Sequence, residues 1–307
     1  MIYDENTHHP LMHPSLIGKL PVALCDQLNK EVAVIDLLAP DPTSDDAIIH
    51  VFKADNKIDE AKLRYSSVLN EYLVCMTSSK TGALRVVKYP SGEPIWEGCA
   101  QGFNPHSIEY LPNGHVACAL AGTGGDNQEI RIYSCDDDGN ISQNYIKTPL
   151  NSAHGLWWDD ELSALWALGH NELVAYKIEG DAQSLKINKV PGLGCHIPAG
   201  SGHDLSMIRS QKGKFFISSD KAYVFDKYQG TLTNDFEGSD IISTRSIKSI
   251  SEHIDGTIVR TVAANVYRPH NTNVLDVFQK DASGNYQHKQ YYFENRAFYK
   301  ARPFILN

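Results

Sequence analysis

The sequence predicts an all-β fold, a single six-bladed β-propeller domain over residues 1–307. Three observations predict it. A short core motif recurs along the chain at a nearly constant spacing, strand-like segments separated by turns follow each copy, and the two chain ends carry complementary parts of one further repeat.

The core motif opens each repeat. Four copies align, and they read His106-Ser107-Ile108, His154-Gly155-Leu156, His203-Asp204-Leu205 and Lys248-Ser249-Ile250. Their first residues are 48, 49 and 45 residues apart, which fits propeller blades of roughly 40–50 residues. Upstream, Ser66-Ser67-Val68 takes the equivalent place, 40 residues before His106.

Strand-like segments follow every core motif. A turn comes first, such as Pro112-Asn113-Gly114, and then an apolar segment such as His115 to Ala121. The next segments alternate apolar and polar residues with a period of two, as in Glu129 to Ser134, which indicates strands. No segment longer than ten residues has helical periodicity with caps, so the remaining architecture to consider is a pair of β-sandwiches.

The two ends of the chain supply the sixth blade. Pro21 to Cys25, Glu31 to Leu37 and Ala47 to Lys53 resemble second, third and fourth strands without a first, and Ala297 to Phe304 resembles a first strand without followers. Pairing them closes the ring and leaves no open sheet edge. Residues 1–20 form an N-terminal extension that we expect to serve as a lid over one mouth of the channel.

Composition limits the classes of partner. The formal net charge is −9 and no long basic run is present, so we expect no nucleic-acid partner. No stretch of about 18 apolar residues exists, so we expect no membrane span. The six cysteines form no CxxC pair and the N-terminus has no apolar leader, which favours a cytoplasmic protein with free thiols. The expected partner is a small-molecule substrate.

The repeated position predicts a site on the propeller axis. In a propeller the first strand of each blade lines the central channel, so the residues that open these strands should meet there. We assign to this ring Ser66, His106, His154, His203, Lys248 and Lys300. The three histidines and Lys248 are the predicted catalytic residues. The predicted substrate-binding residues are Ser66, Lys300 and their neighbours Tyr65, Phe103, Trp157, Trp158, Tyr299 and Arg302.

Such a ring has several chemical uses. His106, His154 and His203 could bind a divalent transition metal, but the two lysines would oppose the metal's charge, so we expect no cofactor. Without a metal, histidine can act as base or hydrogen-bond donor while lysine stabilises developing negative charge. The cations could also bind an anionic ligand passively, and the histidines could instead be structural latches between blades.

The blades that carry His106, His154 and His203, with Leu-Pro-Asn-Gly after the first, resemble those of six-bladed propeller enzymes with axial histidines. The chain loosely resembles the fungal intermolecular hetero-Diels–Alder enzymes, which implies a metal-free reaction. It also resembles oligogalacturonate-lyase-like propellers, which implies metal-dependent cleavage of acidic sugars. Neither resemblance extends to a longer motif.

The cationic ring and the absent leader favour the first resemblance. We therefore predict a metal-free, non-redox cyclase in secondary metabolism that catalyses a hetero-Diels–Alder type of cycloaddition. The alternatives are a metal-dependent lyase acting on an acidic sugar and a non-enzymatic propeller that binds a ligand or a protein.

Overall fold

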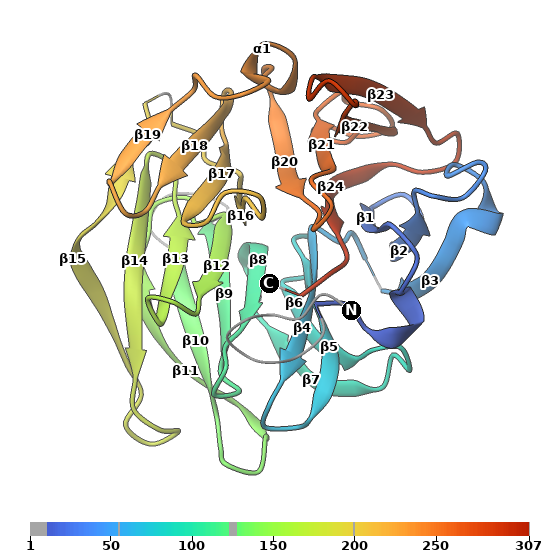
Figure 1. The fold of residues 1–307 in the computed structure, drawn as a ribbon. Helices are drawn as coiled ribbons and strands as arrows, with labels where there is room; N and C mark the ends of the chain where they lie inside the picture. Colours follow the sequence, from blue (N-terminus) through green and yellow to red (C-terminus); the bar gives the residue numbers. More distant parts are fainter. Residues whose placement is uncertain (1–10, 55, 123–127, 199, 307) are drawn as a thin grey trace.

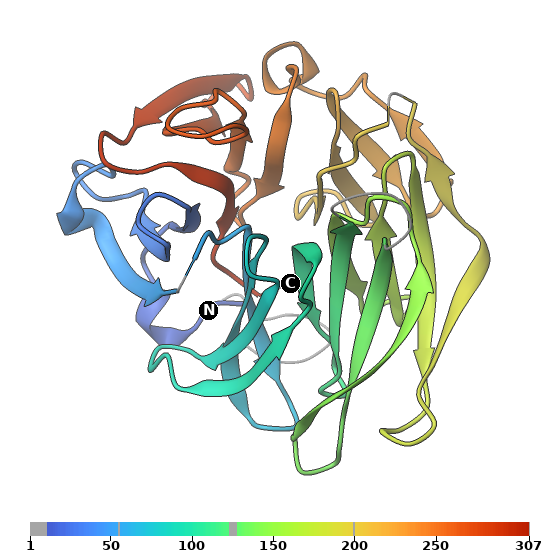
Figure 2. The same ribbon diagram turned by 180° about the vertical axis from the view of Figure 1, so that it is seen from behind.

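The computed structural model describes residues 11–54, 56–122, 128–198 and 200–306. Six four-stranded antiparallel sheets surround a central axis (Figure 1), and the view from behind shows the same ring (Figure 2). This confirms the six-bladed propeller. The fold is nearly all β, because its helical elements are only α1 (Ser239–Ile242) and the 3₁₀ turns η1 (Pro14–Leu16) and η2 (Asp45–Ala47) within the described residues.

Each blade starts at the axis and ends at the rim. Four blades of increasing residue number comprise β4 (Glu60–Ser66), β5 (Glu71–Ser78), β6 (Ala83–Lys88) and β7 (Pro94–Cys99); β8 (Phe103–Tyr110), β9 (Val116–Gly122), β10 (Glu129–Cys135) and β11 (Ile141–Pro149); β12 (Gly155–Asp159), β13 (Ala164–Leu168), β14 (Glu172–Glu179) and β15 (Lys186–His196); and β16 (Asp204–Met207), β17 (Lys214–Ser218), β18 (Ala222–Asp226) and β19 (Thr231–Thr233). The fifth consists of β20 (Ile247–Glu252), β21 (Ile258–Val262), β22 (Val274–Lys280) and β23 (Tyr286–Tyr292).

The sixth blade joins the two ends of the chain, as predicted. Its strands are β24 (Phe298–Pro303), β1 (Pro21–Asp26), β2 (Glu31–Asp36) and β3 (Ile48–Lys53). β24 pairs antiparallel with β1, with Leu24 opposite Ala301. In Figure 1 the red β24 lies beside the blue β1. The innermost strand of this blade therefore comes from the C-terminal end of the chain.

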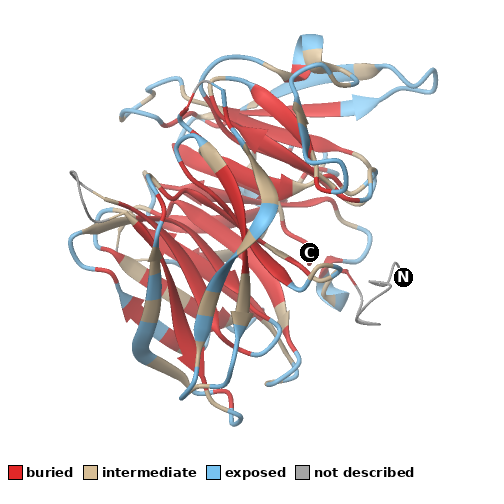
Figure 3. Cartoon of the chain, turned by 90° about the vertical axis from the view of Figure 1, so that its left-hand side faces the viewer, coloured by how far each residue is buried: buried red, intermediate tan, exposed pale blue. Residues whose placement is uncertain are grey.

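Apolar side chains fill the space between neighbouring blades. One cluster joins Leu73 and Leu84 of one blade with Ile108 and Cys118 of the next. Figure 3 shows the inner strands buried and the loops and outer strands exposed. Each fully buried leucine or isoleucine contributes roughly 1.5–3 kcal/mol. The inner strands are thus held in fixed positions by packing from both sides.

The N-terminal extension packs at one end of the channel. Leu11 and Leu16 are buried in a cluster with Phe304 and Leu306, which follow the end of β24. The Leu306 amide also donates to the Leu11 carbonyl at 2.8 Å. Residues 1–10 lie outside the described residues, so the predicted lid falls only in part on the described chain. No helix among the described residues has the length and apolar character needed to span a membrane.

Candidate functional site

A cavity of about 300 Å³ lies at the axis, and every blade contributes to it. One residue at or near the start of each innermost strand lines it. In chain order these six ring residues are Asp59, His106, His154, His203, Lys248 and Tyr299. Four of them, the three histidines and Lys248, are the residues predicted as catalytic. The repeat in the sequence thus brings these four together at one place.

Local backbone geometry turns the ring residues toward the axis. Asp59, His154 and His203 lie immediately before their strands. Their side chains are therefore not bound to the alternation between the two faces of the sheet that holds within a strand. His106 and Lys248 lie inside strands, but the pairing register shifts at both positions. Such bulges redirect a side chain. Except after His154, where Gly155 has no side chain, the next residue is also buried, so two consecutive side chains can face the channel.

The three histidines form a contiguous group. The rings of His106 and His154 stack at a centroid distance of 4.1 Å, and those of His154 and His203 meet edge to face at 5.2 Å. The His203 Nε2 atom lies 2.9 Å from the Lys248 ammonium. A lone pair on this nitrogen therefore accepts from the lysine, and His203 is neutral when Lys248 is charged.

Hydrogen bonds also fix the tautomers of the other two histidines. His154 Nδ1 lies 2.7 Å from the Ser152 carbonyl oxygen, so this nitrogen donates. The Nε2 lone pair of His154 is consequently available to a ligand. The Asn104 amide nitrogen lies 2.8 Å from His106 Nε2, and with the amide as donor His106 accepts there. The ring therefore contains three imidazoles with assigned acceptor nitrogens.

Burial keeps these imidazoles neutral. It lowers the pKa of His154 to about 4 and that of His203 to about 2, with further lowering by the lysines. The pKa of His106 is also well below its usual value, first through burial and then through the neighbouring His154. Desolvation disfavours the charged form of each ring, so all three are bases or hydrogen-bonding groups at neutral pH.

Lys248 and Asp59 are the ring residues that titrate nearer to neutral pH. Burial, and then the nearby Lys300, lower the pKa of Lys248 to about 8. Burial raises the pKa of Asp59 to about 7. The Asp59 carboxylate accepts from the Gln27 side chain at 2.9 Å and from the Ser79 amide. The ring thus offers a mostly protonated amine and a carboxyl group that is half ionised near pH 7.

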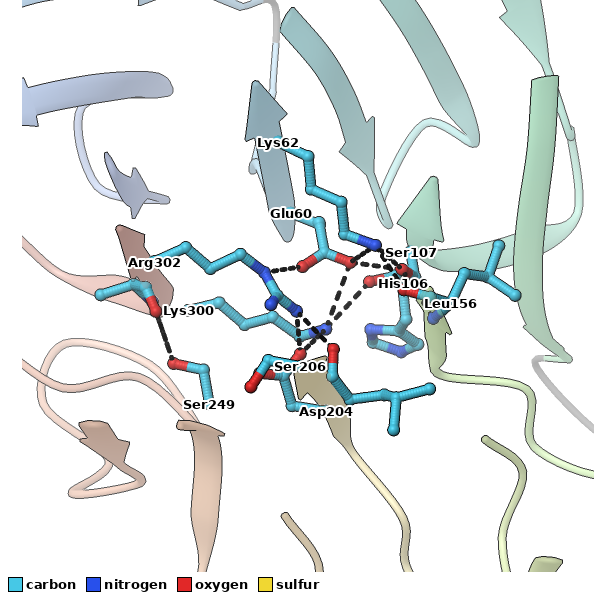
Figure 4. Close-up of polar contacts among 12 residues, drawn as sticks. Glu60, Lys62, His106, Ser107, Leu156, Asp204, Ser206, Ser249, Lys300 and Arg302 are labelled. Carbon is cyan, nitrogen blue, oxygen red and sulfur yellow. Dashed lines mark hydrogen bonds and ion pairs between the residues drawn. The ribbon is translucent and has the colours of Figure 1, made fainter. Parts of the chain in front are cut away.

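A buried network of ion pairs lies directly below the ring. Lys300 Nζ is 3.1 Å from Asp204 and 3.7 Å from Glu60, and Arg302 binds both carboxylates. Figure 4 shows Lys300 reaching between Glu60 and Asp204. Lys62 connects Glu60 to Glu109 at 3.5 and 3.1 Å. These contacts join inner strands of different blades and support the ring from beneath.

Several predicted substrate-binding residues lie elsewhere. Ser66 is at the far end of β4, where its hydroxyl pairs with Tyr110 at 2.8 Å, and the ring of Tyr65 beside it meets that of Tyr72 edge to face. Lys300 is completely buried in the ion-pair network, one residue after the ring position that Tyr299 occupies. The residue predicted to line the axis was therefore seven positions too late in the blade of Ser66 and one position too late at Lys300.

The remaining predicted rim residues also have other partners. The Arg131 guanidinium covers the Phe103 ring at 4.3 Å, and the Trp158 indole donates to Asp160 at 2.8 Å. Trp157 and Arg302 line a second cavity at the other end of the channel. Of the eight predicted substrate-binding residues, Tyr299 lines the ring cavity. The other residues predicted to form an apolar mouth are not among the described residues that line this cavity.

Sequence reasoning missed Asp59 and most of the polar wall. Asp59 precedes His106 by 47 residues, a spacing closer to the repeat period than that of Ser66. A search by spacing alone would have found it. The other missed wall residues come from loops and outer positions, and they are Gln27, Lys57, Ser79, Asn104, Pro269, His270 and Asn271. These residues share no repeat signal.

The histidine geometry does not resemble a metal centre. Two rings are stacked, and the Nε2 atoms of His106 and His203 already pair with Asn104 and Lys248. Across the described ranges no three His, Cys, Asp or Glu side chains are grouped to hold a metal ion. This donor arrangement does not fit the alternative in which the three histidines are ligands. The prediction that the protein uses no cofactor stays a prediction.

A family model matches residues 50–300, and its description is "Family of unknown function (DUF6528)". The match covers most of the chain. This protein belongs to the DUF6528 family. The match contains five of the six innermost strands complete and part of β24, so it includes all six ring residues. No curated protein sequence matches the chain.

Solved structures share the fold at low sequence identity. A protein of unknown function from Bacteroides caccae has a TM-score of 0.59 and 10% identity, covering 94% of this chain and 99% of its own. A candidate 6-phosphogluconolactonase from Bacteroides uniformis has a TM-score of 0.57 and 10% identity, with coverages of 92% and 98%. A functionally unknown protein from Desulfotomaculum acetoxidans has a TM-score of 0.53 and 13% identity, with coverages of 92% and 79%. Identities this low establish similarity of fold alone.

Proposed function

We propose that the ring cavity catalyses a non-redox proton transfer on a compact, polar substrate that carries a carbonyl group beside an acidic C–H bond. The reaction class is elimination or isomerisation. The observation that supports it most directly is the pairing, in one cavity, of a neutral imidazole with an available lone pair and a buried ammonium group. These are the base and the electrostatic stabiliser that enolate formation requires.

His154 is the proposed base. Its Nδ1 proton is held by the Ser152 carbonyl at 2.7 Å, which leaves the lone pair on Nε2, and His154 lines the cavity. In the first step the C–H bond breaks, its proton moves to Nε2, and the electron pair forms an enolate. The low pKa of the empty imidazole, caused by burial, would rise when a negatively charged group binds nearby.

Lys248 is the proposed stabiliser of the enolate oxygen. It reaches the histidine group through His203 at 2.9 Å and is buried. An ammonium in a site with little water stabilises developing negative charge far better than one in solution. In the second step Asp59, half protonated near pH 7, returns a proton to carbon in an isomerisation, or to the leaving group in an elimination.

Charge and volume indicate the substrate class. Lys57 and Lys248 both line the cavity, and Asp59 is the acidic residue of the lining. A substrate with a carboxylate in addition to its carbonyl would suit this balance. A cavity of about 300 Å³ is at the lower limit of ordinary small-molecule sites. Small oxo acids, sugar acids and their lactones fit these requirements.

The hetero-Diels–Alder cyclisation expected from the sequence resemblance has weaker support. That reaction needs an apolar surface for its hydrophobic partner. The rim residues predicted to provide it, Phe103, Trp157 and Trp158, pack elsewhere, and most residues that line the cavity have polar side chains. The Lys248 and Tyr299 donors could activate a carbonyl toward cyclisation. The predicted cyclase activity is therefore proposed only for a polar substrate.

Hydrogen–deuterium exchange tests the proposal. The protein is incubated in D₂O with a panel of oxo acids, sugar acids and lactones, and NMR follows loss of the proton next to the carbonyl. We expect exchange with at least one compound, slowed ~100-fold or more in His154→Gln. His196→Gln is the matched control, because His196 is an exposed residue of β15 outside the cavity.

The other outcomes contradict specific parts of the proposal. Equal exchange rates in wild type and His154→Gln would remove His154 from the role of base. Compounds that bind with an affinity lost in His154→Gln, but never exchange deuterium, would make the cavity a binding site and the protein a non-enzymatic propeller.

A further inference from the structure

A second, smaller cavity lies at the opposite end of the central channel. Its lining includes residues where three inner strands end or just beyond: Met207 and Arg209, Ser251 and Glu252, and Arg302, Pro303 and Ile305. Its volume is about 20 Å³, which accommodates a single particle of about the size of water. Four cationic side chains line it, namely Lys62, Arg64, Arg209 and Arg302.

Among the described residues, positive charge is in excess around this cavity. The network beneath the ring has four cations, Lys62, Arg64, Lys300 and Arg302, and three carboxylates, Glu60, Glu109 and Asp204. Arg209 and Glu252 at the cavity wall add one charge of each sign. The excess of one cation therefore persists. A buried charge without a counterion is strongly unfavourable.

Loss of a proton from Lys62 would not remove the excess without breaking hydrogen bonds. Its Nζ atom donates to Glu109 at 3.1 Å, to Ser107 at 3.1 Å and to the Leu156 carbonyl at 2.6 Å. These three acceptors use all three protons of an ammonium group. Glu252 accepts from the Ser210 amide and hydroxyl, each at 2.8 Å.

Two hydrogen-bond donors of the cavity wall lack an acceptor. The Trp157 Nε1 atom and the Ser251 hydroxyl are buried and have no hydrogen-bond partner among the described residues. Their residues are 6% and 4% exposed, and both line the cavity. An indole N–H can only donate, so it requires an acceptor. The Arg64 and Arg209 guanidinium groups lie 5.5 and 5.9 Å from the centre of the same indole ring.

We propose that this cavity binds one small monovalent anion of the size of chloride. Such an ion would accept from Trp157 and Ser251 and balance the excess cation. A water molecule could accept from the two donors but would leave the charge unbalanced. Sulfate, phosphate and organic carboxylates are too large for a volume of about 20 Å³.

The anion would reinforce closure of the propeller. Arg302 belongs to β24, whereas Lys62 and Arg64 belong to β4 of the neighbouring blade. A shared counterion allows these cations to approach one another at the junction where the C-terminal strand completes the ring. The site is separate from the ring cavity, so it does not depend on the function proposed above.

Thermal unfolding in chloride and in gluconate, at constant ionic strength, tests the site. An ion that binds only the folded protein raises the midpoint as its concentration exceeds the dissociation constant. We expect chloride to raise the midpoint by ~2 °C or more relative to gluconate, with bromide acting similarly and sulfate having no comparable effect. Crystals grown in bromide should show an anomalous peak beside Trp157 and Ser251.

Variants assign the effect to the two donors. Trp157→Phe removes the indole N–H, and we expect at least ~10-fold more chloride to be needed for half of the effect. Ser251→Ala should act in the same direction and replaces the first variant if Trp157→Phe does not fold. Trp158→Phe is the control, since its indole donates to Asp160 at 2.8 Å outside the cavity.

Three results would overturn the proposal. Identical midpoints in chloride and gluconate, with no bromide peak at the cavity, would leave water as the occupant. A sulfate effect equal to that of chloride would exclude a site limited by size. An equal loss of chloride dependence in Trp157→Phe and Trp158→Phe would disprove the role of the Trp157 donor.

Discussion

Two ring residues control the charge of the ring near neutral pH. The histidines are neutral in this pH range, because burial lowers the pKa of each. Burial acts on Asp59 and Lys248 in opposite directions, raising the pKa of the carboxyl to about 7 and lowering that of the amine to about 8. Their titrations therefore overlap the pH range in which acid–base catalysis is most effective.

Lys248 should determine how activity changes in alkaline solution. Its ammonium form, which is proposed to stabilise the enolate, is present below its pKa of about 8 and is lost above it. The rate of deuterium exchange at carbon depends on His154 and Lys248 but not on the Asp59 proton, so it should fall with rising pH above about 8, tenfold per pH unit. Lys248→Arg should move this decline beyond pH 10, because arginine stays charged there. A pH–rate profile checks this, and an unchanged decline in Lys248→Arg would assign it to another group.

At the scale of elements, neighbouring residues of each inner strand have two different roles, one in lining the cavity and one in the ion-pair network. A residue at or near the start of each inner strand lines the cavity, and the next residue often joins the ion-pair network, as with His203 and Asp204 or Tyr299 and Lys300. The network thus holds the strand starts in register below the cavity. Its cations also act on the cavity at a distance, because Lys300 lowers the pKa of Lys248.

This arrangement explains which parts of the site could be predicted from the sequence. The strands and ring closure follow from hydrophobic period and turn residues, and His106, His154 and His203 from an identical residue at equal spacing. Asp59 and Tyr299 differ in type from the other ring members, so matching by residue type selected Lys300 instead of its neighbour. The bulges at His106 and Lys248 and the loop residues of the wall have no pattern in the sequence.

Lys300→Met should separate a structural from a substrate-binding role of Lys300. The lysine has no exposed surface and contacts Asp204 at 3.1 Å. Its removal breaks the ion pairs with Asp204 and Glu60 and the hydrogen bond to the His106 carbonyl, so we expect a loss of stability on the order of 3 kcal/mol. The alkaline decline of activity should also move to higher pH, since a cation near Lys248 is gone. Lys186→Met, at an exposed position of β15, is the control for chemical denaturation and pH profiles.

A different pattern would contradict that role. If Lys300→Met raised KM strongly while stability and the pH profile stayed as in the wild type, Lys300 would contact the substrate, as first expected from the sequence.

At the scale of the whole molecule, charge is distributed unevenly between surface and axis. The chain has a formal net charge of −9, yet its channel has excess cations at one end and two lysines in the cavity at the other. The negative net charge is the basis for the prediction of no nucleic-acid partner, which stays a prediction. The positive channel favours small anions that are able to enter it.

Ring closure by β24 is the feature on which both cavities depend. β24 contributes Tyr299 to the ring cavity and Arg302 to the second cavity, and it pairs with β1 from the other end of the chain. Removing residues 298–307 would expose the edge of β1 and leave Asp204 and Glu60 without Lys300 and Arg302. We therefore expect this truncation to abolish a single cooperative unfolding transition measured by calorimetry or circular dichroism.

A circular permutant distinguishes loss of β24 from a simple need for native chain ends. The Leu306 amide bonds to the Leu11 carbonyl at 2.8 Å, so a short Gly/Ser linker can join residues 306 and 11. New ends can be placed in the exposed turn at residues 281–284 between β22 and β23. The permutant keeps every strand and should unfold in one transition within a few degrees of wild type. A truncated chain that unfolds as cooperatively as the permutant would show that five blades are stable without closure.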